Sequence, residues 1–163
     1  FAKSVFVKTQ IRYAVSDART AEELLADFIA ELQDLASADS TLCDTTLLIH
    51  PYVLQNFLDY NDFLDLADAT IADLGLDGEI QIASFHPDYQ FAGTNPTDID
   101  NYTNRSPYPI LHLLRESSIE RAVAAFPDAS DIYEKNIETL HRIGIEGWHA
   151  LGLAAVSMPT NKK

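Results

Sequence analysis

The sequence predicts an α/β protein with a single-layer mixed or parallel sheet of three to four strands in β-α-β-α-β order, covered by helices and followed by two to three C-terminal helices. Three observations predict it: apolar residues alternate near the N-terminus, helical periodicity recurs further along, and short apolar runs lie between the helical stretches. Strands that alternate with helices form parallel pairs through right-handed crossovers. We expect one domain over residues 1–156 and a flexible tail at 157–163.

The first half of the chain contains the clearest patterns. Apolar residues at every second position from Val5 to Val15 predict a long first strand over residues 4–15. Thr20 and Glu23 form a capping box before a helix over residues 20–37. The run Thr45 to Ile49 is apolar on both faces, which places this second strand in the middle of the sheet with helices on each side.

A helix over residues 57–74, which Gly75 ends as a left-handed residue, and a third strand over residues 80–85 come next. A polar segment from Asp88 to Pro109 follows, and loops of this length are more often functional or disordered than simple connections. We then expect a helix over 109–126 with proline in its first turn, a helix over 130–143, and a short helix containing Trp148.

Composition limits the classes of protein to which this chain can belong. The formal net charge of −14 opposes binding to a phosphate backbone, so DNA and RNA are not expected partners. The sequence contains no run of about 18 apolar residues, the length that a helix needs to span a bilayer, so we expect a soluble protein. The single cysteine, Cys43, allows no internal disulfide, which fits a reducing, cytoplasmic location.

Two strands end in the same dipeptide, His50-Pro51 and His86-Pro87. Proline disfavours helical backbone at the residue before it, so both histidines should lie where a strand gives way to a loop. Ligands bind at the carboxyl ends of parallel strands in open α/β sheets, so these histidines are candidate site residues. The alternative is that they only cap the loops.

A possible metal or acid/base centre surrounds His86. Asp88 lies two residues further on, so in extended backbone the two side chains point to the same side. Two histidines and a carboxylate suit zinc, manganese or iron, which makes His50, His86 and Asp88 a candidate ligand set for a divalent metal. His112 is an alternative third ligand and, with His86 and Asp88, a candidate catalytic group. It could equally be a core histidine held by one hydrogen bond.

Two arginines could bind an anion. Arg105 lies just ahead of the helix expected from Pro109, where free main-chain N–H groups also favour an anion. Arg115 follows His112 by three residues and should point into the same space. Alternatively, Arg105 ties the long loop to an aspartate. The remaining candidate ligand-binding residues belong to the long loop, although its aromatic rings more often form a loop core: Tyr89, Tyr102 and Asn104.

Three segments of the chain resemble one known family. They are Ala83 to Gly93 (ASFHPDYQFAG), Asn101 to Pro109 (NYTNRSPYP) and Leu111 to Glu116 (LHLLRE). These segments are similar to the signature of a bacterial family called domain of unknown function 1415, and the likeness runs over nearly the whole chain. The resemblance implies a preceding stretch ending in Cys-Pro-Phe-Ala, so the family's cysteine would precede Phe1 and Cys43 does not match it. It implies no particular reaction, cofactor or partner.

Common catalytic motifs are missing from the sequence: there is no Walker loop, Gly-x-Gly-x-x-Gly, nucleophile elbow or His-Glu-x-x-His. Two hypotheses follow. The first is a metal-dependent or acid/base enzyme acting on a small anionic molecule at a His/Asp/Arg site. The second is a non-catalytic ligand-binding or protein-interaction domain, in which the histidines only organise the loop.

Overall fold

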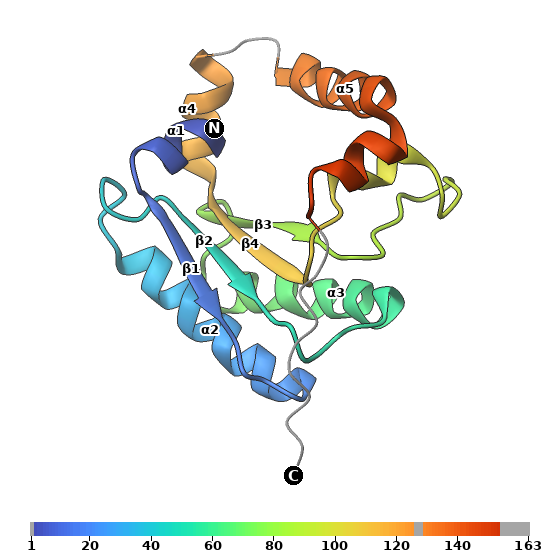
Figure 1. Cartoon of the computed structure of the whole chain (residues 1–163). Coiled ribbons are helices and arrows are strands. Elements are labelled where there is room, and N and C mark those ends of the chain that lie inside the picture. Colours follow the sequence, from blue (N-terminus) through green and yellow to red (C-terminus); the bar gives the residue numbers. More distant parts are fainter. Residues whose placement is uncertain (1, 126–128, 154–163) are drawn as a thin grey trace.

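The last strand in the chain lies inside the sheet. The computed structural model describes residues 2–125 and 129–153 (Figure 1). Its elements are α1 (Ala2–Val7), β1 (Ile11–Val15), α2 (Ala21–Ser37), β2 (Thr45–Ile49), α3 (Phe57–Asp73), β3 (Ile80–Phe85), the 3-10 helix η1 (Ile99–Thr103), β4 (Ile110–Arg115), α4 (Glu116–Ala125) and α5 (Ala129–Ala150). The four strands have the order β1-β2-β4-β3. β1 and β2 are parallel, whereas β4 is antiparallel to both neighbours, so the sheet is mixed.

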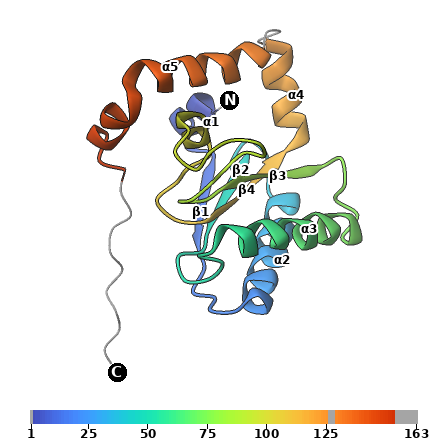
Figure 2. The ribbon, with the colours of Figure 1, turned by 90° about the vertical axis from the view of Figure 1, so that its right-hand side faces the viewer.

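One face of the sheet carries the core. α2 and α3 lie side by side against this face (Figure 2). Phe28 and Leu32 of α2 pack there with Leu48 of β2 and with Leu111 and Leu113 of β4, and all five side chains are buried. On the opposite side, α5 contacts η1 instead of lying flat on the strands. The expectation that helices cover β2 on both faces is therefore met on one face only.

The two helices predicted in the first half of the chain are confirmed. The Thr20 hydroxyl accepts a hydrogen bond from the Glu23 N–H at 3.2 Å, and the Glu23 carboxylate accepts one from the Thr20 N–H at 3.3 Å, as a capping box requires. α3 ends before Gly75, whose φ of +71° is the left-handed conformation expected there.

The predicted first strand over residues 4–15 is wrong in its first half, where α1 forms instead. β2 begins at Thr45, which lies opposite Ile11, so residues before Ile11 have no strand to pair with. The chain turns between α1 and β1 at Thr9, whose φ is +57°. The Gln10 N–H then bonds to the Val5 carbonyl at 2.9 Å and closes the end of α1.

The predicted helix over 109–126 is also wrong in its first half. Ile110 to Arg115 form β4, and only Glu116 onward is helical. A short apolar run fits either a buried strand or a buried helix, and its local periodicity does not separate the two. Here the run pairs with a strand on each side, and Leu111 and Leu113 are fully buried on one face of the sheet. Tertiary pairing decides the structure.

The C-terminal helix matches two predicted elements. α5 is interrupted at Gly144, whose φ of +65° and ψ of 179° are not helical, so the segment with Trp148 is a separate short helix as expected. The predicted tail at 157–163 lies outside the described residues. None of the helices in residues 2–125 and 129–153 has the length and apolarity that crossing a membrane requires.

Candidate functional site

A hollow of about 360 Å³ lies between the loop after β3 and the end of α5. Its lining comes from both segments: Pro87, Tyr102, Arg105, Ser106, Pro107, Trp148, His149 and Leu153. Most of these side chains are apolar or aromatic, and Arg105 supplies the permanent positive charge. Ligand sites are typically concave and mostly apolar with a few polar groups that fix orientation.

The Arg105 guanidinium lines this hollow and also hydrogen bonds to the main chain of the long loop. Its Nε–H donates to the Tyr89 carbonyl at 3.3 Å and its Nη2 donates to the Pro96 carbonyl at 2.7 Å. The group also lies 4.2 Å from the centre of the Tyr102 ring, within cation–π range. Arg105 therefore ties the loop to main-chain carbonyls and not to an aspartate as the alternative supposed. Within the described residues, Nη1 has no hydrogen-bond partner.

α5 completes the hollow through two contacts with η1. The rings of Tyr102 and Trp148 meet edge to face with centres 5.3 Å apart. Seven residues earlier in α5, on the other side of the interruption at Gly144, His141 Nε2 lies 2.7 Å from Asp100 Oδ1. Sequence reasoning missed Trp148, Pro87 and Pro107 as site residues. Trp148 is the one tryptophan of the chain, and this rarity is the sequence feature that could have marked it as a site residue.

The long loop has an organising centre of its own. Asn101 is fully buried, and its Oδ1 accepts bonds from the Phe91 N–H and the Thr94 hydroxyl at 2.9 and 2.8 Å. Asn104, a predicted ligand-binding residue, donates from Nδ2 to the Ser84 carbonyl at 3.0 Å. The Tyr89 ring packs on Phe57 and Phe91. These contacts hold the loop together, whereas Tyr102 alone of the three predicted loop residues lines the hollow.

His86 lies at the end of β3, as the His-Pro pattern predicts, but its ring is bonded to the main chain. Nδ1 accepts the Asp88 N–H at 3.0 Å, so Nε2 carries the proton and donates to the Leu54 carbonyl at 3.2 Å. Asp88 thus contacts His86 through its main-chain N–H and not through the carboxylate that the predicted site requires. Burial lowers the pKa of His86 below its usual value, which keeps the ring neutral.

His50 lies at the end of β2 and is also fully buried. Its Nδ1 donates to the Val53 carbonyl at 3.1 Å, and Nε2 has no hydrogen-bond partner among the described residues. Burial lowers the pKa of His50 from 6.5 to about 4. Because β4 separates β2 from β3, the two histidines do not meet directly. Both rings pack against Tyr60, with centre distances of 5.8 Å for His50 and 5.1 Å for His86.

The predicted metal centre gains no support from this arrangement. In the described part of the chain, no group of three or more His, Cys, Asp or Glu side chains lies so that it could hold a metal ion. Both nitrogens of His86 are engaged with the main chain, and so is Nδ1 of His50. A metal would have to displace these bonds.

His112 lies on β4 and not on a helix, which places it away from the other two histidines. It faces Leu47 of β2 and Ala83 of β3 in the sheet register. The Thr45 hydroxyl donates to the Leu113 carbonyl at 2.6 Å, so it accepts from His112 Nε2 at 2.7 Å. Burial lowers the pKa of His112 from 6.5 to about 4. This geometry matches the alternative interpretation, in which His112 is a core histidine held by one hydrogen bond.

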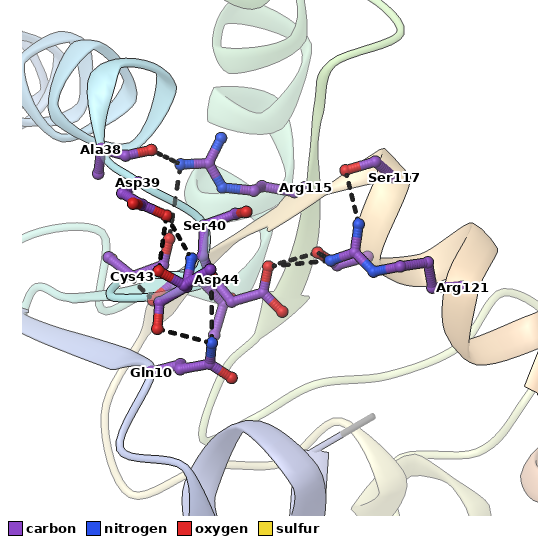
Figure 3. Close-up of polar contacts among 12 residues, drawn as sticks. Gln10, Ala38, Asp39, Ser40, Cys43, Asp44, Arg115, Ser117 and Arg121 are labelled. Atoms are coloured by element: carbon purple, nitrogen blue, oxygen red, sulfur yellow. Dashed lines mark hydrogen bonds and ion pairs between the residues drawn. The ribbon is translucent and has the colours of Figure 1, made fainter.

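Arg115 lies at the other end of β4 from the hollow, about 17 Å along a strand at about 3.4 Å per residue. Its Nη2 donates to the Ala38 carbonyl at 2.7 Å (Figure 3). It also donates to the Leu35 carbonyl, so Arg115 holds the C-terminal end of α2. Arg115 also helps hold the pKa of Asp39 below its usual value, after the larger effect of hydrogen bonds from Thr41. It does not share a site with His112.

The fold and the hollow define an α/β protein with a mixed four-stranded sheet and an arginine-lined hollow between the loop after β3 and α5. The chain belongs to the family described as protein of unknown function (DUF1415), whose model matches residues 1–150. This match confirms the resemblance found in the sequence. Neither a curated protein nor a solved structure matches the chain.

Proposed function

We propose that this domain binds a small anionic molecule with an apolar or aromatic body in the hollow beside Arg105. The observation that carries the proposal is the position of the guanidinium: it stacks on Tyr102, lines the hollow, and leaves Nη1 without a partner among the described residues. A carboxylate or phosphate group on the ligand would bond to Nη1. The ligand body would lie against Trp148 and the two prolines.

The geometry favours ligand binding over histidine catalysis. A general acid or base must reach the substrate within hydrogen-bonding distance. The rings of His50 and His86 are fully buried and bonded to carbonyls of residues 53 and 54. Pro87, next to His86, lines the hollow, but the imidazole itself does not. We therefore assign His86 to the support of the loop that forms the wall.

The ligand test uses Trp148, because the chain has one tryptophan and it lies in the wall. Purified protein is titrated with phenyl phosphate, and Trp148 emission is followed. We expect a saturable change, with inorganic phosphate binding more weakly because it lacks the apolar body. Arg105→Gln should weaken phenyl phosphate binding about tenfold, since a hydrogen bond to a charged group contributes about 1.5–3 kcal/mol.

A second pair of variants separates charge from loop integrity, because Arg105 also tethers the loop. His149 is exposed at the rim of the hollow, so its replacement leaves the tethers intact. His149→Lys should strengthen phenyl phosphate binding and His149→Glu should weaken it. Equal binding of phenol and phenyl phosphate, or equal affinities of the two His149 variants, would contradict an anion site here.

A further inference from the structure

The outer edge of β1 is free to pair with another strand. β1 is the outermost strand of the sheet, with β2 as its neighbour. Gln10 and Ser16 both hydrogen bond to the β2 side. Successive residues of a strand present their main-chain groups to opposite edges, so those of Ile11, Tyr13 and Val15 point away from the sheet. In residues 2–125 and 129–153, these N–H and C=O groups have no hydrogen-bond partner.

β1 contains neither proline nor lysine, and its register with β2 runs without a bulge. Native edges are commonly shortened, bulged, covered, or protected by proline and lysine. Here two large side chains project from β1 on the face opposite α2, and they are 57% (Tyr13) and 64% (Val15) exposed. Arg12 projects toward α2, where its Nε–H donates to Glu31 at 2.6 Å. The edge therefore offers unpaired main-chain groups next to exposed apolar side chains.

An acidic cleft lies along the same edge, between the C-terminal half of β1 and α2. Its volume is about 560 Å³. Its floor includes Ala14 and Leu48, and its charged lining is mostly acidic: Asp17, Arg19, Glu23, Asp27 and Glu31. A strand added beside β1 would direct every second side chain to the α2 side of the sheet, over this cleft. Basic side chains at those positions would meet the carboxylates.

We propose that the edge of β1 binds an extended segment of another protein by strand addition, and that this segment alternates Lys or Arg with apolar residues. The basic side chains enter the cleft beside Asp17 and Asp27. The apolar side chains lie beside Tyr13 and Val15, and the main chains pair. This surface is distinct from the hollow at Arg105, so the inference does not depend on the proposed ligand.

Charge argues against a second copy of this chain as the occupant. Each copy carries a net charge of −14, and the cleft of one copy would face the acidic α2 side of the other. The single basic residue of β1, Arg12, is already paired with Glu31. Like charges placed across an interface oppose association, whereas a basic segment is attracted.

The probe is a fluorescein-labelled peptide in which Lys and Val alternate, with binding followed by fluorescence anisotropy. Tyr13→Pro removes the outward N–H and leaves the β1–β2 bonds in place, because Tyr13 does not bond to β2. We expect this change to weaken binding about tenfold. Tyr13→Val is the matched control: it removes the ring and keeps the N–H, so its affinity should stay closer to that of the wild type. Far-UV circular dichroism verifies folding, and Val15→Pro replaces Tyr13→Pro if the latter unfolds.

Two further arms test the chemistry of the partner. Asp17→Asn with Asp27→Asn should weaken peptide binding about tenfold and reduce its salt dependence. A peptide with the same composition but with all Lys before all Val should bind several-fold more weakly, because its charges cannot follow the alternation. Absence of binding, equal binding to the proline variant, or equal binding of the block peptide would overturn the proposal. So would self-association that Tyr13→Pro abolishes, since a second copy would then occupy the edge.

Discussion

The hydroxyl of Tyr60 donates to the carbonyl of Ile110 at 2.8 Å, although Tyr60 lies on α3 and Ile110 begins β4. The same oxygen accepts the Phe85 N–H at 3.1 Å. Phe85 and Ile110 face each other in the last pair between β3 and β4. One buried phenol thus connects a helix to two strand ends, directly before His86 and the long loop.

Tyr60→Phe should destabilise the protein by about 1–3 kcal/mol, because it leaves the Phe85 N–H and the Ile110 carbonyl without their partner. The free energy of unfolding in urea measures this change. Tyr13→Phe makes the same chemical change on an exposed side chain and should have an effect near zero. Equal effects of the two variants would show that the Tyr60 bonds contribute little.

Stability should fall on acidification well before the carboxylates titrate. Burial lowers the pKa of both His50 and His112 from 6.5 to about 4. The unfolded chain therefore binds more protons than the folded protein below pH 6.5, so the free energy of unfolding decreases as the pH falls from 6.5 toward 4. Each such histidine is expected to contribute on the order of 2 to 3 kcal/mol of this loss.

The control for this pH dependence uses isosteric replacements that cannot titrate. His50→Asn keeps a donor for the Val53 carbonyl, and His112→Gln keeps a donor for the Thr45 hydroxyl. Urea unfolding between pH 6.5 and 4.5 should then depend less on pH in each variant and least in the double variant. An unchanged dependence in the double variant would mean that these histidines are protonated in the folded protein.

Local rules in the sequence predicted the elements whose boundaries are set locally. The capping box at Thr20, the left-handed Gly75 and the apolar run of β2 each need only neighbouring residues, and the structure confirms all three. The failures lie where a distant segment decides. Val5 and Val7 alternate like a strand but have no strand beside them. Ile110 to Leu114 have the composition of a helix but pair with two strands.

The sequence predicted the part of the candidate site that one segment forms, and it missed the part that a distant segment adds. Arg105 and Tyr102 are brought together in one wall, and they were recognisable as a basic and an aromatic residue in one polar loop. Trp148 reaches the same hollow from more than 40 residues away, through the docking of α5 on η1. No local pattern encodes that docking. Arg115 was grouped with His112 by helical spacing, and that spacing lost its meaning once β4 formed.

Arg115→Gln should destabilise the fold and leave the ligand site unchanged. Its guanidinium holds the last carbonyls of α2 and bonds to the Cys43 carbonyl at 3.5 Å. Loss of charged hydrogen bonds to a helix C-terminus should cost about 2 kcal/mol of unfolding free energy. Arg121→Gln is the matched control, since its side chain is 61% exposed beside Asp44 and should cost less than about 1 kcal/mol. A loss of phenyl phosphate binding in Arg115→Gln at full folding would contradict this structural role.

The docking of α5 should open more easily than the rest of the fold. Among the described residues, the contacts of α5 with η1 include the His141–Asp100 pair at 2.7 Å and the Trp148–Tyr102 rings. Asp100→Ala removes the first contact, so Trp148 should become more exposed and its emission should shift to longer wavelength, while the main urea transition stays in place. Asp62→Ala, an exposed position on α3, is the control. If the pair couples α5 to η1, the double variant Asp100→Ala/His141→Ala shows the same emission as Asp100→Ala alone, whereas additive shifts would mean that the two side chains act independently.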